Sequence, residues 1–285
     1  MSFPVLGTYL ARLTNSAHTR TRVWLDKDGR AKGRYFNCTL TSAFQPIRVL
    51  DSSRVVGYEA FARSSSATDS GLSLWKLLDH SANDDESIEL DRLCRMLHAI
   101  NYYRQSEAAH ADLYLSVHDR LLAAVSTNHG VAFQRILAAL GLPADKIVLQ
   151  LPGVSQSQGW LLSYVADNYR RNGFRFAVNI SEPAEGLALL GTIRPDVLKI
   201  DAREIADESA ISELLTAASE TGTRVVFKRL ESVKALEILR EVRANIDLPI
   251  FAQGFLLDTP KSLLDPFEPP EIQTRPALFN DQRPA

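Results

Sequence analysis

The chain has 285 residues, of which 45% are apolar and 23% charged, and its formal net charge is −2. This length supplies ample material for a core in one large domain or two small ones. The near-neutral charge argues against a general nucleic-acid binder, and no stretch reaches the ~18 uninterrupted apolar residues of a membrane-spanning helix.

Residues 1–40 are expected to form a basic N-terminal extension. Asp28 and Gly29 lie between apolar runs at residues 23–25 and 35–36, and this pattern predicts a β-hairpin. The stretch contains the basic residues Arg20, Arg22, Lys27, Arg30, Lys32 and Arg34 against Asp26 and Asp28. Two interpretations stay open: a solvated decoration that covers one end of the domain, or a surface for a partner or an anionic ligand.

The cysteines and the first residues bear on the compartment. Cys38 and Cys94 have no metal-binding spacing and no partner motif, which is typical of a reduced setting. The first residues have neither the basic segment nor the apolar stretch of a signal peptide. We therefore expect a cytoplasmic protein that does not associate with a membrane.

From about residue 43, apolar runs of strand length alternate with helical patterns. The predicted strands are Ala43–Leu50, Arg54–Glu59, Leu113–Val117, Lys146–Leu151, Phe174–Val178, Asp196–Ile200, Arg224–Phe227 and Pro249–Ala252. Their nearly continuous apolar character is typical of strands that are covered on both faces. The clearest helical patterns are 87–104, 210–221 and 232–245.

Eight strands with intervening helices predict an α/β fold, a TIM-like (β/α)8 barrel. Only three residues, 51–53, separate the first two strands, so these strands should form a hairpin and one barrel strand should run antiparallel to its neighbours. We assign residues 41–262 to the barrel. Residues 263–285 are rich in proline and are predicted to be an extended or disordered tail.

In a barrel of this type, functional groups sit where strands end and loops begin, at the carboxyl face. The polar and aromatic residues at or just after the strand ends are therefore the candidate ligand-binding set. These are Gln45, Glu59, Phe61, Arg63, His118, Asn179, Lys199, Lys228, Glu231, Gln253 and Phe255.

Four segments, in their order and spacing, resemble the landmarks of the EAL family, bacterial phosphodiesterases that linearise cyclic diguanylate (c-di-GMP). They are Phe44-Gln45-Pro46-Ile47, Gly57-Tyr58-Glu59-Ala60-Phe61-Ala62-Arg63, Asp196-Val197-Leu198-Lys199-Ile200-Asp201 and Ala252-Gln253-Gly254-Phe255. The resemblance runs from roughly residue 40 to 262. It implies the barrel with its antiparallel strand, as in EAL domains, although the signature here reads Glu-Ala-Phe.

The resemblance also implies a pair of metal ions, and here the sequence departs from the family. Active members hold the metals with the signature Glu, an Asn on the third strand, a Glu on the fourth, two adjacent Asp on the fifth and a Glu on the seventh. Of this set only Glu59 is present. The other positions read His118, Gln150, Asn179-Ile180 and Lys228.

These replacements predict that metal-dependent hydrolysis is lost. Amides bind hard cations poorly, and a dication beside Lys228 meets a repulsion of ~4 kcal/mol per unit charge at 4 Å and an effective dielectric near 20. Without a metal, no water is activated near neutral pH. We expect no cofactor and no bound metal. His118 can in principle ligate a metal, but a lone His is more often a hydrogen-bonded structural group.

Two non-catalytic hypotheses follow. In the first, the protein is a metal-independent c-di-GMP receptor or regulator: Arg63 pairs with a phosphate, Lys199 or Lys228 replaces the charge of the metals, and Phe61, Phe227 or Phe255 stacks on guanine. In the second, it is a nucleotide-independent module that binds a protein partner, and Lys228 pairs with Glu59 to close an empty pocket. Weak phosphodiesterase activity is the third hypothesis.

Overall fold

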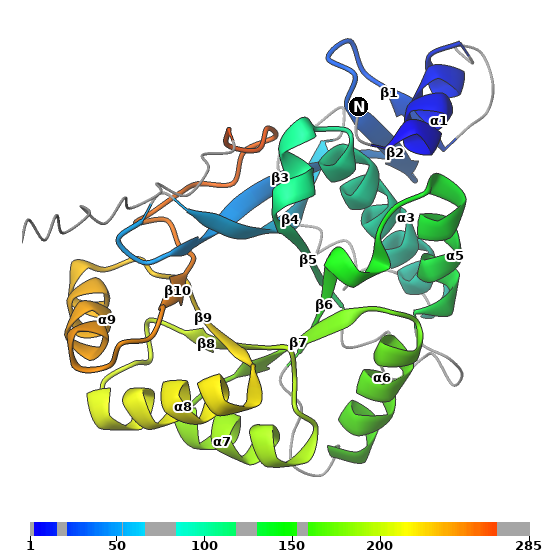
Figure 1. The fold of residues 1–285 in the computed structure, drawn as a ribbon. Helices are drawn as coiled ribbons and strands as arrows, with labels where there is room; N and C mark the ends of the chain where they lie inside the picture. Colours follow the sequence, from blue (N-terminus) through cyan, green and yellow to red (C-terminus); the bar gives the residue numbers. More distant parts are fainter. Residues whose placement is uncertain are drawn as a thin grey trace, which may run out of the picture.

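A closed ring of eight strands forms the centre of the molecule, with helices around its outside (Figure 1). The computed structural model describes residues 3–15, 22–52, 54–65, 84–117, 130–152 and 159–266. The ring strands are β3 (Cys38–Val49), β4 (Val55–Ser65), β5 (Asp112–Ser116), β6 (Ile147–Leu151), β7 (Arg175–Ile180), β8 (Val197–Asp201), β9 (Arg224–Lys228) and β10 (Phe251–Ala252). The predicted TIM-like barrel is confirmed.

One strand of the ring, β3, runs against both of its neighbours. It pairs antiparallel with β4 on one side and with β10 on the other, whereas the pairs from β4 round to β10 are parallel. The short connection at residues 50–54 dictates this arrangement, because it leaves no room for a crossover helix. The predicted antiparallel strand is therefore present.

Both strands of this hairpin are longer than the sequence predicted. Strand β3 begins at Cys38 and β4 continues to Ser65, and their pairing starts at Thr39 with Ser65. This outer part of the hairpin is buried on one face only, with burial alternating along residues 38–41. Polar residues are tolerated there, so the apolar runs in the sequence mark only the part of each strand inside the barrel.

The helices pack outside the ring. They are α3 (Asp84–Tyr103), α5 (Val131–Leu140), α6 (Gly159–Arg171), α7 (Pro183–Thr192), α8 (Glu208–Thr221) and α9 (Val233–Asn245), with short 3-10 turns η1 (Ser106–His110) and η2 (Ala144–Lys146). The three predicted helices appear within three residues of their expected bounds. Helix α8 begins at the side chain of Asp207, which accepts from the N–H groups of Ser209 and Ala210, and it ends at Gly222 in the left-handed region.

The N-terminal part contains a helix that was not predicted from the sequence. Helix α1 (Pro4–Asn15) precedes the hairpin of β1 (Val23–Leu25) and β2 (Ala31–Tyr35), and β2 extends the sheet from the first residues of β3. Part of the basic charge is neutralised within this part, since Asp26 pairs with both Arg30 and Lys32. The division of the chain at residues 40 and 262 stays a prediction.

Apolar side chains fill the barrel and the layer between ring and helices. Inside the ring a small cluster consists of Ile47, Tyr114, Val148, Ala177, Val197 and Val226. All five residues of β6 are buried, as expected for a strand that is covered on both faces. Cys38 and Cys94 are buried free thiols. Among the helices in the described ranges, none has both the length and the apolarity needed to cross a membrane.

Candidate functional site

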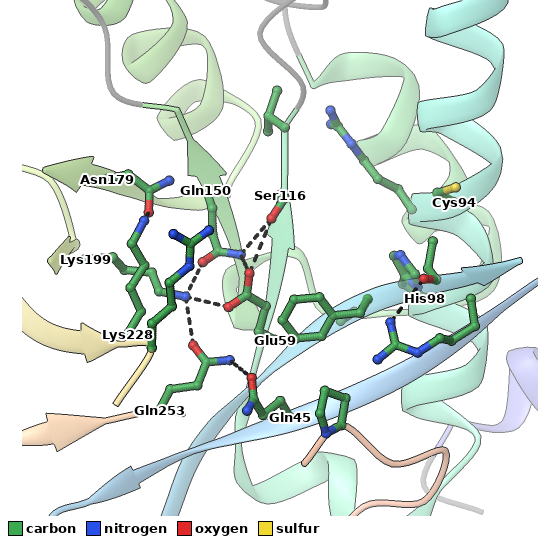
Figure 2. A pocket seen from close by; sticks show the side chains of 18 of the residues that line it. Gln45, Glu59, Cys94, His98, Ser116, Gln150, Asn179, Lys199, Lys228 and Gln253 are labelled. Carbon is green, nitrogen blue, oxygen red and sulfur yellow. Dashed lines mark hydrogen bonds and ion pairs between the residues drawn. The ribbon is translucent and has the colours of Figure 1, made fainter. Parts of the chain in front are cut away.

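A cavity of about 950 Å³ opens at the carboxyl ends of the barrel strands (Figure 2). Its walls come from the strand ends, from the outer part of the β3–β4 hairpin and from one face of α3. The predicted candidates that line it are Gln45, Glu59, Phe61, Arg63, Asn179, Lys199, Lys228, Glu231, Gln253 and Phe255. The remaining candidate, His118, lies outside the described residues.

Glu59 lies at the centre of the pocket floor, where its carboxylate forms an ion pair with Lys199. The Nζ atom of Lys199 is 2.7 Å from Oε2 of Glu59, and the two side chains are 1% and 13% exposed. The hypothesis that Lys228 neutralises Glu59 by direct pairing is therefore wrong. Lys228 lies opposite Asp201, two residues beyond Lys199 along the sheet, and so its side chain starts nearer the mouth of the pocket.

The ammonium group of Lys199 is fully occupied. It donates to Oε2 of Glu59 at 2.7 Å, to Oε1 of Gln150 at 2.5 Å and to Oε1 of Gln253 at 3.1 Å. A lysine has three N–H donors, so these three bonds use all of them. Gln150 also donates from Nε2 to Oε1 of Glu59 at 2.9 Å, and the hydroxyl of Ser116 lies 3.4 Å from the same oxygen.

Two opposing effects act on the pKa of Glu59. Burial by itself raises it, but the charge of Lys199 and the hydrogen bonds from Lys199 and Gln150 outweigh burial and lower the pKa below its ordinary value. The carboxylate is therefore held ionised. Its two oxygens face donors from three neighbouring side chains, and in the described part of the chain no three His, Cys, Asp or Glu side chains gather as a metal site requires.

Lys228 has a different environment from Lys199. Its Nζ donates to Oδ1 of Asn179 at 2.7 Å, and Asn179 is itself fixed by a bond from Nδ2 to the carbonyl of Leu151. Burial, followed by the positive charges of Lys199 and Arg229, lowers the pKa of Lys228. No carboxylate among the described residues forms an ion pair with it, and it is only partly buried.

A row of amides connects the ion pair to the chain beyond the last strand. Gln253 donates from Nε2 to Oε1 of Gln45 at 3.2 Å, and Gln45 donates from Nε2 to the carbonyl of Asp258 at 2.7 Å. Figure 2 shows both amides beside Glu59 and Lys199. Gln150, Ser116 and Asp258 were not among the predicted binding residues, although Gln150 and Ser116 both stand at strand ends.

The aromatic candidates divide into two groups. Phe61 and Phe255 line the pocket, with Phe255 62% exposed. Phe227 is fully buried in the outer core, so the expectation that it stacks on a base is wrong. Its neighbours Val226 and Lys228 face the barrel interior, and side chains alternate along a strand, which turns Phe227 toward the helices. The Arg63 guanidinium lies 5.8 Å from the centre of the Phe61 ring.

Helix α3 contributes polar side chains to the pocket wall, and these were not predicted from the sequence. Arg95 forms a buried ion pair with Asp91, and Nδ1 of His98 lies 2.8 Å from the hydroxyl of Ser42. Burial and the nearby charge of Arg63 lower the pKa of His98 to about 3, so this imidazole is neutral near pH 7. The sequence spacing could have indicated this wall, because Asp91, Arg95 and His98 recur at helical intervals on the apolar face of α3.

The comparisons with known proteins agree with this geometry. No curated protein matches the chain. YkuI of Bacillus subtilis, solved with c-di-GMP and calcium, is similar with a TM-score of 0.65 and 20% identity over 80% of this chain. BlrP1 of Klebsiella pneumoniae is similar in its manganese and c-di-GMP complex (TM-score 0.64, 21% identity, 78% of this chain). It is also similar in a complex with FMN and c-di-GMP without metal ions (TM-score 0.59, 20% identity, 78% of this chain).

These likenesses concern the fold, and the chain spans 56%, 56% and 53% of the three solved proteins. The family model for the EAL domain matches residues 34–260, which is most of the chain and includes all eight ring strands. The barrel, its antiparallel strand and the position of Glu59 at the carboxyl face fit that match. This chain is a member of the EAL domain family.

Proposed function

We propose that the chain is a catalytically inactive EAL-domain protein whose pocket binds c-di-GMP without a divalent metal. The observation that carries the proposal is the ammonium group of Lys199, which gives all three of its protons to Glu59, Gln150 and Gln253. The one carboxylate retained from the expected metal-binding set is thereby saturated by protein donors.

The donor set does not suit the metal pair that the family implies. A dication needs several oxygen ligands, preferably carboxylates, whereas Gln150 and Asn179 supply amides and Lys199 and Lys228 supply positive charge to the pocket. A metal at Glu59 would have to displace Lys199 and leave a buried ammonium without its partner, which is costly. The complex of BlrP1 with c-di-GMP and no metal ions supports nucleotide binding without a metal on this fold.

The anion-binding role falls to Lys228 rather than Lys199. Lys199 has no N–H left, while Lys228 uses one of its three on Asn179 and lines the cavity. Arg63, at the opposite wall, forms no ion pair with any described carboxylate, and its one hydrogen bond within the described part of the chain goes to the carbonyl of Ala62 at 3.3 Å. Two phosphate groups of a cyclic dinucleotide would match two separated cations of this kind.

The apolar contacts come from two rings. Phe61 and the exposed Phe255 stand on the lining of the cavity, and a purine stacked on an aromatic side chain gains ~1–3 kcal/mol. Together with the two cations, they give the pocket the combination of stacking and charge that a guanine nucleotide needs.

Calorimetric titration of c-di-GMP, with and without Mg²⁺, tests the proposal. We expect binding of equal strength in both conditions and no linear dinucleotide under Mg²⁺ or Mn²⁺. Arg63→Ala should weaken binding ~10–150-fold, because a charge-assisted contact is worth ~1.5–3 kcal/mol. Arg240→Ala is the matched control, since Arg240 is exposed and pairs with Asp51 at the other end of the barrel.

Two results would contradict the proposal. Binding that requires Mg²⁺ would show that Lys228 does not replace the metals. Linear product above background that disappears in Glu59→Ala would show that the site is an active phosphodiesterase.

A second candidate function is a module that binds a protein partner independently of any nucleotide. The observation that favours it is the same floor, because Glu59, Gln150 and Lys199 satisfy one another and the pocket needs no ligand to stay folded. Absence of detectable binding at millimolar c-di-GMP would support this candidate over the receptor.

A further inference from the structure

The chain after β10 returns along β3 as a strap, defined here as residues 254–265. Phe44 and Lys261 exchange two backbone hydrogen bonds, from N–H of Phe44 to O of Lys261 at 2.6 Å and in the reverse direction at 2.9 Å. Near its end, the N–H of Asp265 donates to the hydroxyl of Tyr58 at 3.0 Å. The strap is therefore fixed along the hairpin that carries Gln45 and Glu59.

Arg48 of β3 anchors the strap through ion pairs with two of its carboxylates. Its guanidinium donates to both carboxylate oxygens of Asp258, at 2.6 and 3.0 Å, and to Oδ2 of Asp265 at 2.5 Å. The three side chains are 10–24% exposed, so solvent screens the contact only in part. Two-pronged contacts of this kind fix geometry as well as adding energy. Arg48 thus sets the position of Asp258, whose carbonyl reaches the pocket floor.

The direction of the amide row follows from its two ends. The Asp258 carbonyl can only accept, and the Lys199 ammonium can only donate. Gln45 must therefore turn its NH₂ toward Asp258 and its oxygen toward Gln253, and Gln253 must turn its NH₂ toward Gln45 and its oxygen toward Lys199. Reversing either amide would bring two donors or two acceptors together.

We infer that Arg48 is a positioning residue: it holds the Asp258 carbonyl so that Gln45 and Gln253 keep this orientation. The second N–H of Gln253 bonds to the Glu59 carboxylate and helps to lower its pKa, so the N–H that remains outside the row belongs to Gln45, while both amide oxygens already accept from a donor. The floor therefore favours acceptors on the ligand, such as phosphate oxygens or the O6 and N7 atoms of guanine. This inference concerns the pocket of the proposed function, and its first test needs no ligand.

The first test measures hydrogen exchange of the Gln45 and Gln253 side-chain amides by NMR in the unliganded full chain, with Gln45→Ala to assign the signals. Arg48→Met should speed the exchange of both amides, whereas Arg240→Met, which removes an exposed arginine from Asp51, should not. Unchanged exchange in Arg48→Met would overturn the inference whether or not the protein binds c-di-GMP.

The second test is a double-mutant cycle on c-di-GMP affinity. Arg48→Met should weaken binding roughly 2- to 10-fold in the native background, as expected for one hydrogen bond, and should add no loss in Gln45→Ala. Equal losses in both backgrounds would mean that Arg48 acts through overall stability and would overturn the inference. If native protein does not bind at all, the receptor proposal fails and the exchange result alone decides on Arg48.

Arg48→Lys covers the case in which the methionine variant does not fold. A lysine keeps the charge but cannot make the two-pronged contact with Asp258. Exchange of the two amides should then be faster than in native protein, and a native exchange rate would again contradict the positioning role.

Discussion

A carboxylate forms an ion pair with basic side chains at each end of the barrel interior. The two ends differ in the side chains that surround this ion pair. At the carboxyl face Glu59 meets Lys199 and is enclosed by amides. At the opposite face Asp112 forms ion pairs with both Arg175 and Arg224. The two carboxylates are almost equally buried, with side chains 13% and 9% exposed.

Tyr114 lies between the two ends. Its hydroxyl accepts from Arg224 at 3.0 Å, and its ring lies 5.7 Å from the Nζ atom of Lys199. The two arginines have side chains 30% and 26% exposed, so their charge is partly solvated, whereas Lys199 is enclosed. A buried ion pair can therefore close one end of the barrel, as at Asp112, or form the floor of a 950 Å³ cavity, as at Glu59.

The largest expected effect comes from breaking the enclosed pair. Lys199→Met leaves Glu59 buried without a cation and should lower the free energy of unfolding by ~3–5 kcal/mol. Lys228→Met is the control from the same pocket, and its cost should stay within ~1 kcal/mol because its bonded partner is the neutral Asn179. Denaturant unfolding of both variants measures the difference. Similar losses in the two would show that Lys199 is not the principal partner of Glu59.

The pH dependence should change sign in the same variant. In native protein the pKa of Glu59 is lowered, so its contribution is complete above the ordinary value of about 4.5 and is lost as the pH falls through the lower, folded-state pKa. In Lys199→Met the charge and the hydrogen bond of Lys199 are gone, and burial, the largest single effect, should outweigh the remaining amide hydrogen bonds and raise that pKa, so stability should fall as the pH rises above about 4.5, by at most ~1.4 kcal/mol per pH unit. Unfolding measured from pH 3 to 8 gives both slopes, and parallel curves would contradict the pairing.

The opposite end should tolerate loss of either arginine. Arg175→Met or Arg224→Met should each cost about 1 kcal/mol, because Asp112 keeps its other partner and the pairs are partly exposed. The double variant should lose more than the sum, since Asp112 is then buried without any cation. A strictly additive result would show that the two ion pairs are independent. None of these changes should alter c-di-GMP affinity, which calorimetry can check.

The smallest effect is expected from restoring a single carboxylate. Lys228→Glu should not produce linear dinucleotide with Mg²⁺ or Mn²⁺, because Gln150 and Asn179 remain neutral and Lys199 still occupies Glu59. Chromatography of the reaction mixture, with Glu59→Ala in the same background as the control, measures this. Product that depends on Glu59 would mean that one substitution is enough to recover a working site.

Much of the architecture could be predicted from the sequence alone. Strands covered on both faces must be apolar along their whole length, so the apolar runs predicted the bounds of β5 to β9 within two residues. The short link between β3 and β4, residues 50–54, required an antiparallel neighbour. The outer hairpin and α1 were not found, because polar residues there blur the periodic patterns on which such predictions depend.

For the site, the sequence determined which residues stand at strand ends, and those it selected within the described ranges do line one cavity. The tertiary structure decided which of them touch. Alternation along a strand tells inward from outward positions, but the stagger between strands sets which inward residues share a layer. That stagger brings Lys199 rather than Lys228 to Glu59, and it turns Gln253 and Gln45 toward a carbonyl that only the returning strap supplies.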